Sequence, residues 1–223
     1  MRQARRYFDW QHRLIAPELG PRVLEVGCGI GNFTRTIADR ECVIGIDVDE
    51  GCVEAMRRNL AGYWNVEARH MDVVSSEFVR LSAELPDSIV CLNVLEHIED
   101  DRQALANMHA VLRAGGRAIL IVPAFEALYG PIDANLGHYR RYSKRAFRKL
   151  AAESGFSVVK LRYMNCAGFF GWWVNARLLK RDRQSEKQIA FFDAVLAPLQ
   201  ERLERLVAVP LGQSLFVVLE KRG

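Results

Sequence analysis

The chain contains 223 residues, half of them hydrophobic, and its formal net charge is +4. This length supports one sizeable α/β domain with its own core and is short for two, so we expect residues 1–223 to form a single domain. The charge excess is small and no added RNA-binding domain is visible, which argues against nucleic acid as a partner.

The compartment indicated by the sequence is the cytoplasm. The segment from Met1 to Asp9 is charged and aromatic and lacks the apolar core of a signal peptide, and no apolar run reaches transmembrane length. The five cysteines form no C-x-x-C pair. We therefore expect small buried thiols in a reducing compartment and no bound metal, while contact with a membrane surface stays open.

The first part of the chain alternates between strand-like and helix-like segments. A leading helix is expected at Arg2–Leu19, within an N-terminal segment of residues 1–21, and it could be a lid over the site or simple packing. Apolar, β-branched runs and helical periodicity then predict the following elements. The strands are Arg22–Val26, Cys42–Ile46, Asn65–Arg69, Ser88–Leu92 and Arg117–Val122, and the helices are Phe33–Asp39, Glu50–Ala61 and Asp101–Arg113.

The pattern changes after Pro123. An irregular stretch is expected at Ala124–Tyr142, and Ser143 is the expected N-cap of the next helix. That helix, Lys144–Glu153, precedes a strand at Phe156–Tyr163. A long, mainly helical segment, residues 164–213, then leads to a last strand at Ser214–Glu220; within it, an amphipathic helix at Ile189–Val207 is expected to break at Pro198 and could contact a second subunit.

The regular β–α alternation predicts a doubly wound parallel sheet with helices on both faces. Ligands of such sheets bind at the carboxyl ends of the strands. Gly27, Asp47, Asp72 and Asn93 all fall at such ends or just after them. The sequence therefore predicts one ligand site along this edge.

The glycine-rich turn after the first strand limits the choice of ligand. It lacks the Gly-Lys-Ser/Thr of a P-loop, and its glycines match the dinucleotide fingerprint G-x-G-x-x-G poorly. An acid-x-Gly-x-Gly-x-Gly signature, which suits S-adenosylmethionine, is complete at Glu25, Gly27, Gly29 and Gly31. Glycines permit close backbone approach to a ligand, and the helix start after them offers free N–H groups.

Other side chains fit the same cofactor. The carboxylate of Asp47 suits the two ribose hydroxyls, and that of Asp72 can accept from the adenine amino group, with Met71 and Val73 flanking the ring. Asn93 and Leu95 would line the methionine end. The full set expected to bind the cofactor is Glu25, Gly27, Cys28, Gly29, Asn32, Phe33, Asp47, Val48, Met71, Asp72, Val73, Asn93, Val94 and Leu95.

These motifs resemble those of the class I S-adenosylmethionine-dependent methyltransferases. The resemblance rests on Val23–Gly31, Val43–Asp47, His70–Val73, Leu112–Gly116 and a Leu-Glu-His-Ile segment at Leu95–Ile98, as in methyltransferases of type 11/12. It covers about Val23 to Tyr163. The family implies a Rossmann-like seven-stranded sheet whose last strand lies antiparallel between the fifth and sixth. The segment 164–213 would then be a helical insertion before that strand.

The stretch Tyr129–Tyr142 is the expected acceptor site. His138 is the expected general base, with Asp133 orienting it, because its ordinary pKa lies near operating pH. His97 is expected to line the site, with a role as base as the second option. Arg140 or Arg141 could hold an anionic group, and the loop could instead pack and bind only solvent. The residues expected to bind the acceptor are Tyr129, Tyr139, Arg140, Arg141 and Tyr142.

The aromatic run Phe169–Trp173 lies between two basic clusters. The first consists of Lys144, Arg145, Arg148 and Lys149, and the second of Arg177, Lys180, Arg181 and Arg183. It fits either a packed helix with a solvated basic face, or a lipid-linked acceptor or membrane surface. We expect methyl transfer to a small-molecule or lipid-linked acceptor, at oxygen. The alternatives are an N-methyltransferase, a non-catalytic cofactor-binding partner and a nicotinamide oxidoreductase.

Overall fold

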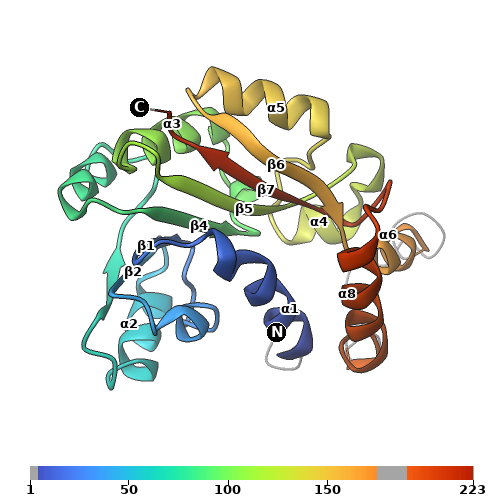
Figure 1. The fold of residues 1–223 in the computed structure, drawn as a ribbon, viewed down its shortest axis with the longest axis horizontal. Helices are drawn as coiled ribbons and strands as arrows, with labels where there is room; N and C mark the ends of the chain where they lie inside the picture. Colours follow the sequence, from blue (N-terminus) through green and yellow to red (C-terminus); the bar gives the residue numbers. More distant parts are fainter. Residues whose placement is uncertain (1–4, 175–189, 223) are drawn as a thin grey trace.

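The computed structural model describes residues 5–174 and 190–222. Within them, seven strands form one sheet in the order β3-β2-β1-β4-β5-β7-β6 (Figure 1). Strands β1 to β6 run in the same direction, and β7 pairs antiparallel with both β5 and β6. The predicted sheet with an antiparallel last strand is confirmed. The strands are β1 (Arg22–Val26), β2 (Cys42–Asp47), β3 (Val66–His70), β4 (Ser88–Leu92), β5 (Arg117–Pro123), β6 (Ser157–Met164) and β7 (Ser214–Glu220).

Helices cover both faces of the sheet (Figure 1). Successive side chains of a strand point to opposite faces, so Leu24 and Val26 join one core cluster and Val23 joins another. The first cluster includes Leu105 of α3, and the second includes Trp10 of α1. The helices of the sheet region are α1 (Arg5–Ile15), α2 (Glu50–Asn59), α3 (Asp101–Val111), α4 (Pro131–Asn135) and α5 (Lys144–Glu153).

Three helix starts follow from their capping side chains. Asp49 accepts from the backbone of Cys52 at the start of α2, and Asp100 caps α3 in the same way. Ser143, the predicted N-cap, accepts from the backbone of Ala146 at the start of α5. Each side chain satisfies a backbone N–H that has no partner within its helix.

The helix predicted at Phe33–Asp39 is wrong. Only a short 3₁₀ turn forms, at Thr34–Ile37. The hydroxyl of Thr36 donates to the carbonyl of Phe33, and that of Thr34 donates to Glu25. Local bonds of this kind compete with a regular helix. The argument from a helix N-terminus after the glycines therefore does not hold, and the glycine loop must bind a ligand through its own backbone.

The insertion before β7 contains α6 (Cys166–Trp173) and a second helical stretch that ends in α8 (Ala197–Leu206). The break predicted at Pro198 is wrong, because a π-helical turn at Phe192–Leu196 runs directly into α8. Pro198 has no N–H for the carbonyl of Ala194, and the guanidinium of Arg6 donates to this carbonyl instead. The basic cluster predicted at Arg177, Lys180, Arg181 and Arg183 lies outside the described residues.

The N-terminal helix packs on this insertion as well as on the sheet. Trp10 is buried in the core, so its face of α1 is fixed against the sheet. Arg13 forms a bidentate ion pair with Glu201 of α8, with N···O distances of 2.6 and 2.7 Å. The backbone N–H of Tyr7 donates to the carboxylate of Asp193 at 2.9 Å. The role of this helix as a lid stays a prediction.

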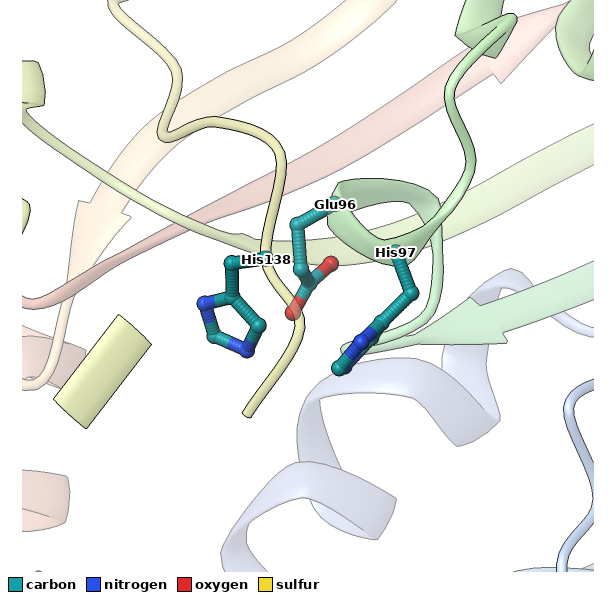
Figure 2. Close-up of side chains that lie close together, drawn as sticks. All are labelled: Glu96, His97 and His138. Atoms are coloured by element: carbon teal, nitrogen blue, oxygen red, sulfur yellow. The ribbon is translucent and has the colours of Figure 1, made fainter. Parts of the chain in front are cut away.

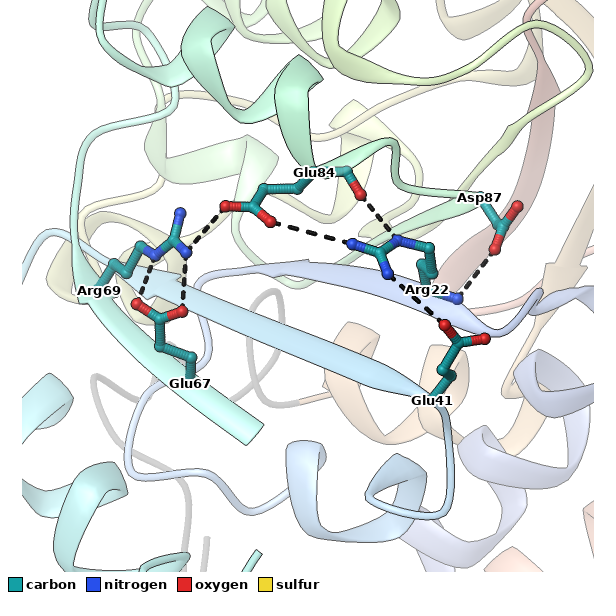
Figure 3. A network of polar contacts seen from close by, with 6 residues as sticks. All are labelled: Arg22, Glu41, Glu67, Arg69, Glu84 and Asp87. Carbon is teal, nitrogen blue, oxygen red and sulfur yellow. Dashed lines mark hydrogen bonds and ion pairs between the residues drawn. The ribbon is translucent and has the colours of Figure 1, made fainter. Parts of the chain in front are cut away.

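A network of ion pairs links the start of β1 to β3 (Figure 3). Arg22, the first residue of β1, donates through its backbone to Asp87 at 2.9 Å and lies 3.6 Å from Glu41. Its side chain also donates to the carbonyl of Glu84, whose carboxylate lies 3.0 Å from Arg69. These contacts join β1, β3 and the segments before β2 and β4.

None of the helices within residues 5–174 and 190–222 has the length and apolar composition needed to cross a bilayer.

Candidate active site

The glycine loop follows β1 directly and passes close to the segment after β4. Gly27 has a φ of 76°, and a Cβ atom there would lie 2.2 Å from Cγ2 of Val94. At Gly29, where φ is 52°, an added Cβ would meet no heavy atom within 4 Å. Gly27 is therefore required for packing, while Gly29 borders open space. This open space above the strand ends provides the room that a ligand needs.

Glu25 lies beneath the loop. Its carboxylate is buried and accepts a bond from the hydroxyl of Thr34 at 2.7 Å. Burial raises its pKa to about 8, and the nearby charge of Asp47 acts in the same direction. Glu25 thus holds the two ends of the loop together. Thr34 was not among the predicted site residues, although its position one turn after the glycines was visible.

We expect Glu25→Gln to remove a pH-dependent loss of stability. Because the folded pKa is about 8 and the unfolded value is about 4.3, neutral Glu25 stabilises the fold below about pH 4. That contribution is lost as the pH rises through about 8. Between about pH 4 and pH 8, the free energy of unfolding of the variant should therefore rise relative to that of the wild type. The expected difference is a few kcal/mol, since one pKa unit corresponds to about 1.4 kcal/mol. Urea unfolding at pH 5 and pH 9 measures this.

Glu54→Gln, at an exposed position of α2, is the matched control for that measurement. It should show the same pH dependence as the wild type. If the Glu25→Gln and wild-type stabilities change in parallel with pH, the buried carboxyl does not carry the effect.

Asp47 ends β2 beside the glycine loop. One of its oxygens accepts from the backbone of Gly29 at 2.8 Å, and the other accepts from Asp49 at 3.0 Å. Asp72, after β3, is exposed and accepts from the backbone of Val74 at 3.0 Å. Since each carboxylate oxygen has two lone pairs, both aspartates keep acceptor capacity. The predicted roles with ribose and adenine stay predictions.

The other predicted cofactor residues divide by burial. Val48 and Asn32 are exposed, whereas Met71, Asn93 and Val94 are half-buried. Phe33 and Val73 belong to the core clusters on opposite faces of the sheet, so their side chains primarily pack the fold. Cys28 and Leu95 are buried as well.

Asp133 is the centre of the loop after β5. It is fully buried, and its Oδ1 lies 3.0 Å from Nδ1 of His138 and accepts from Arg141 at 2.8 Å. Its Oδ2 accepts from the backbone of Gly130 at 3.0 Å. Burial alone would raise the pKa of Asp133, but the bonds from His138 and Arg141 outweigh it and hold the pKa below its usual range. Asp133 thus contacts His138 as the orienting role requires.

Arg141 does not face an acceptor. Its side chain is 1% exposed, pairs with Asp133 and donates to the carbonyl of Ala124 at 3.1 Å. Its guanidinium also lies 4.6 Å from the ring centroid of Trp172 on α6. The prediction that Arg141 binds an anionic acceptor is therefore wrong, because the charge is already neutralised inside the protein.

The neighbouring residues have different surroundings. Tyr142 is buried, and its hydroxyl donates to Asp101 at 2.9 Å, so it too contributes to the fold instead of lining the site as predicted. Arg140 lies 2.9 Å from Asp101 and remains partly exposed. Tyr129 and Tyr139 are exposed, and the hydroxyl of Tyr129 donates to the carbonyl of His138 at 2.7 Å.

Three chemically active side chains converge between β4 and this loop: Glu96, His97 and His138 (Figure 2). The rings of His97 and His138 meet edge to face, with centroids 4.6 Å apart. Glu96 is 1% exposed, and burial raises its pKa to about 8. Burial, followed by the neighbouring His138, lowers the pKa of His97. The sequence indicated His97 and His138 but not the burial of Glu96, since Glu96 precedes an exposed histidine.

Comparison with known proteins identifies the family of the chain. A family model described as a methyltransferase domain matches residues 1–161. A protein of Mycolicibacterium smegmatis, named a probable S-adenosylmethionine-dependent methyltransferase, is 31% identical over 166 residues, or 68% of this chain and 60% of the relative. The ubiquinone biosynthesis O-methyltransferase of Aeromonas salmonicida is 27% identical over 113 residues, or 50% of this chain and 47% of the relative. The chain thus spans about half the length of the curated relatives it matches.

Solved structures share the fold. The N-methyltransferase NodS of Bradyrhizobium japonicum WM9, in complex with S-adenosyl-L-homocysteine, has a TM-score of 0.62 at 18% identity, covering 98% of this chain and 87% of that one. A SAM-dependent methyltransferase of Archaeoglobus fulgidus has a TM-score of 0.64 at 19% identity, covering 97% and 94%. With the glycine loop, the strand order and a family match over well over half of the chain, the protein belongs to the methyltransferase domain family, within the class I S-adenosylmethionine-dependent methyltransferases.

Proposed function

We propose that this enzyme methylates a hydroxyl oxygen of a small-molecule or lipid-linked acceptor. The observation that carries the proposal is the pairing of His138 with Asp133 in the loop after β5. With Nδ1 donating to Asp133, the other ring nitrogen, Nε2, carries a lone pair and can take a hydroxyl proton. An amine acceptor, once deprotonated, has no such need.

Residues at the strand ends would hold the cofactor. The backbone of the glycine loop, Asp47 and Asp72 are the groups that fit its amino-acid end, ribose and adenine. When bound, S-adenosylmethionine supplies a methyl group on a positively charged sulfur. The chain's own task is to place the acceptor oxygen in line with that group and to accept the proton, because alignment supplies much of the rate.

An apolar surface beside the acceptor loop supports a lipid-linked or otherwise amphipathic acceptor. Trp172 of α6 packs on Leu128 and Ile132 of the loop region, which places α6 next to the expected acceptor site. The neighbouring side chains Phe170 and Trp173 are 56% and 43% exposed. The name of the Aeromonas salmonicida relative supports oxygen as the methylated atom.

Methyl transfer from labelled S-adenosylmethionine to three acceptor classes tests the proposal: soluble phenols and catechols, the same phenols carrying a polyprenyl tail in detergent micelles, and primary amines. The expected product is a methyl ether, identified by mass and by fragmentation. Transfer to amines alone would make the protein an N-methyltransferase. Cofactor binding without transfer to any class would favour a non-catalytic binding partner.

Asp47→Ala is expected to weaken cofactor binding. The change removes an ionised acceptor for two hydroxyls and also the bond to Gly29 that positions the loop. Hydrogen bonds to charged groups contribute about 1.5–3 kcal/mol each, so the dissociation constant of S-adenosylhomocysteine should rise by about tenfold to a hundredfold. Titration calorimetry measures it. Asp39→Ala, at an exposed aspartate after the 3₁₀ turn Thr34–Ile37, should bind like the wild type.

A further inference from the structure

The cluster of Glu96, His97 and His138 has the composition of a metal site. Each of the three offers one ligand atom, and these atoms all lie within 4.8 Å of one another. Two imidazoles and one carboxylate form a donor set found at catalytic zinc sites, where a fourth position stays open. Zinc–nitrogen and zinc–oxygen bonds of about 2.1 Å would place tetrahedral ligands about 3.4 Å apart. Small side-chain rotations would therefore bring the three onto one ion.

Glu96 gives an independent reason to expect a cation here. It is 1% exposed, yet its Oε2 has no hydrogen-bond partner among the described residues. Burying an unpaired carboxylate oxygen is costly, and such atoms in native proteins call for an explanation. Figure 2 shows this carboxylate beside the two histidine rings, where a shared ion would satisfy it.

The second layer of contacts also fits. Metal-binding histidines usually donate their other ring nitrogen to a carboxylate, which fixes the ring and its tautomer. His138 does this toward Asp133, at 3.0 Å. Arg141 pairs with Asp133 there and neutralises its charge. The remaining side chains of the cluster are electron-pair donors, which suit a cation and not an anion.

We propose that Glu96, His97 and His138 bind a divalent transition-metal ion of the zinc type, with one coordination position open toward the acceptor. Imidazole ligands favour zinc and its neighbours over magnesium or calcium, which prefer oxygen ligands alone.

A metal ion at this site would change how the acceptor is activated. This catalytic role of the ion rests on the proposed function. An acceptor hydroxyl that meets the ion in the open position has a lowered pKa and gives its proton to solvent. The oxygen then forms a bond to the methyl carbon, the methyl–sulfur bond breaks, and sulfur keeps the electron pair. His138 acts in this form as a ligand and not as the base.

Metal binding itself provides the test. The full chain is freed of metal with a chelator and titrated with Zn²⁺ against a chromophoric chelator, and with Co²⁺ followed by its visible absorption. We expect one ion per chain and a tetrahedral Co²⁺ spectrum. His97→Ala and Glu96→Gln should each lower zinc affinity by at least about 100-fold, since even changes in outer-shell partners cost about 10- to 100-fold. His109→Gln, at a histidine outside the cluster, is the matched control.

Binding of S-adenosylhomocysteine by the same variants shows whether they are folded. Retained cofactor binding with lost zinc binding would support the site. Absence of stoichiometric zinc in the wild type, or zinc affinity equal in all variants, would overturn it. Methyl transfer that persists unchanged in the metal-free protein would also overturn the catalytic part, while leaving the proposed function intact. Zinc binding without transfer to any acceptor would instead remove the proposed function alone.

Discussion

Replacing His138 with alanine is expected to lower the turnover number by about 100- to 10,000-fold, the usual range for losing a positioned acid–base group. The same loss follows if His138 is a ligand, because the acceptor would then lose its metal. Binding of S-adenosylhomocysteine should change little, since the proposed cofactor residues lie on the glycine loop and at or after the ends of β2, β3 and β4, outside the loop that carries His138. Turnover with the acceptor found by the labelling assay, together with calorimetry, measures both effects.

His109→Gln is the control for this experiment as well, because this histidine packs its ring on Phe156 at a centroid distance of 5.0 Å and takes no part in the cluster. Turnover of His138→Ala equal to that of the wild type would remove His138 from the mechanism in either role. A parallel loss of cofactor affinity would point to a collapsed loop and not to lost chemistry.

Arg141→Met is expected to lower the free energy of unfolding by about 3–5 kcal/mol, the cost of breaking a buried ion pair from one side. The change leaves Asp133 buried with His138 as its remaining side-chain partner and removes the stacking on Trp172. Because Asp133 also contacts His138, the proposed base or ligand, turnover should fall together with stability. Chemical denaturation followed by circular dichroism gives the free energy.

The adjacent Arg140 supplies a matched control. Arg140→Met removes a partly exposed pair with Asp101, and such pairs contribute about 1 kcal/mol or less. Equal destabilisation by the two variants would contradict the assignment of Arg141 to the interior. A double change, Asp133→Asn with Arg141→Met, should cost less than the two single costs added, because the two residues form one pair.

The positions of the proposed cofactor residues relative to the strands were predictable, because hydrophobic periodicity and turn residues are local features of the sequence, while their binding roles stay predictions. The glycines after β1, Asp47 at the end of β2, Asp72 after β3 and the N-cap Ser143 all lie at positions defined by a strand end or a helix start. The order of β5, β7 and β6 came from family resemblance, since the pairing of β7 between them is a long-range contact with no local signal.

The acceptor half was only partly predictable. Arg140 and Arg141 are identical neighbours in an irregular loop without periodicity, so their sequence positions could not show which one is buried against Asp133. The burial of Glu96 depends in the same way on packing from distant elements. The helix predicted at Phe33–Asp39 was wrong for another reason. Threonine hydroxyls in this segment form local hydrogen bonds that compete with a regular helix, and hydrophobic periodicity does not reveal such bonds.

The contacts of α1 with the insertion impose an order on folding during synthesis. Arg13 and Glu201, which pair directly, are 188 positions apart, and β6 pairs with the sheet only through β7. On the ribosome, the first helix therefore lacks this partner, and the sixth strand lacks its neighbour, until the last elements emerge. Distant contacts of this kind form slowly and leave unpaired edges exposed in the meantime. The nascent chain thus carries its open strand edge until β7 closes the sheet.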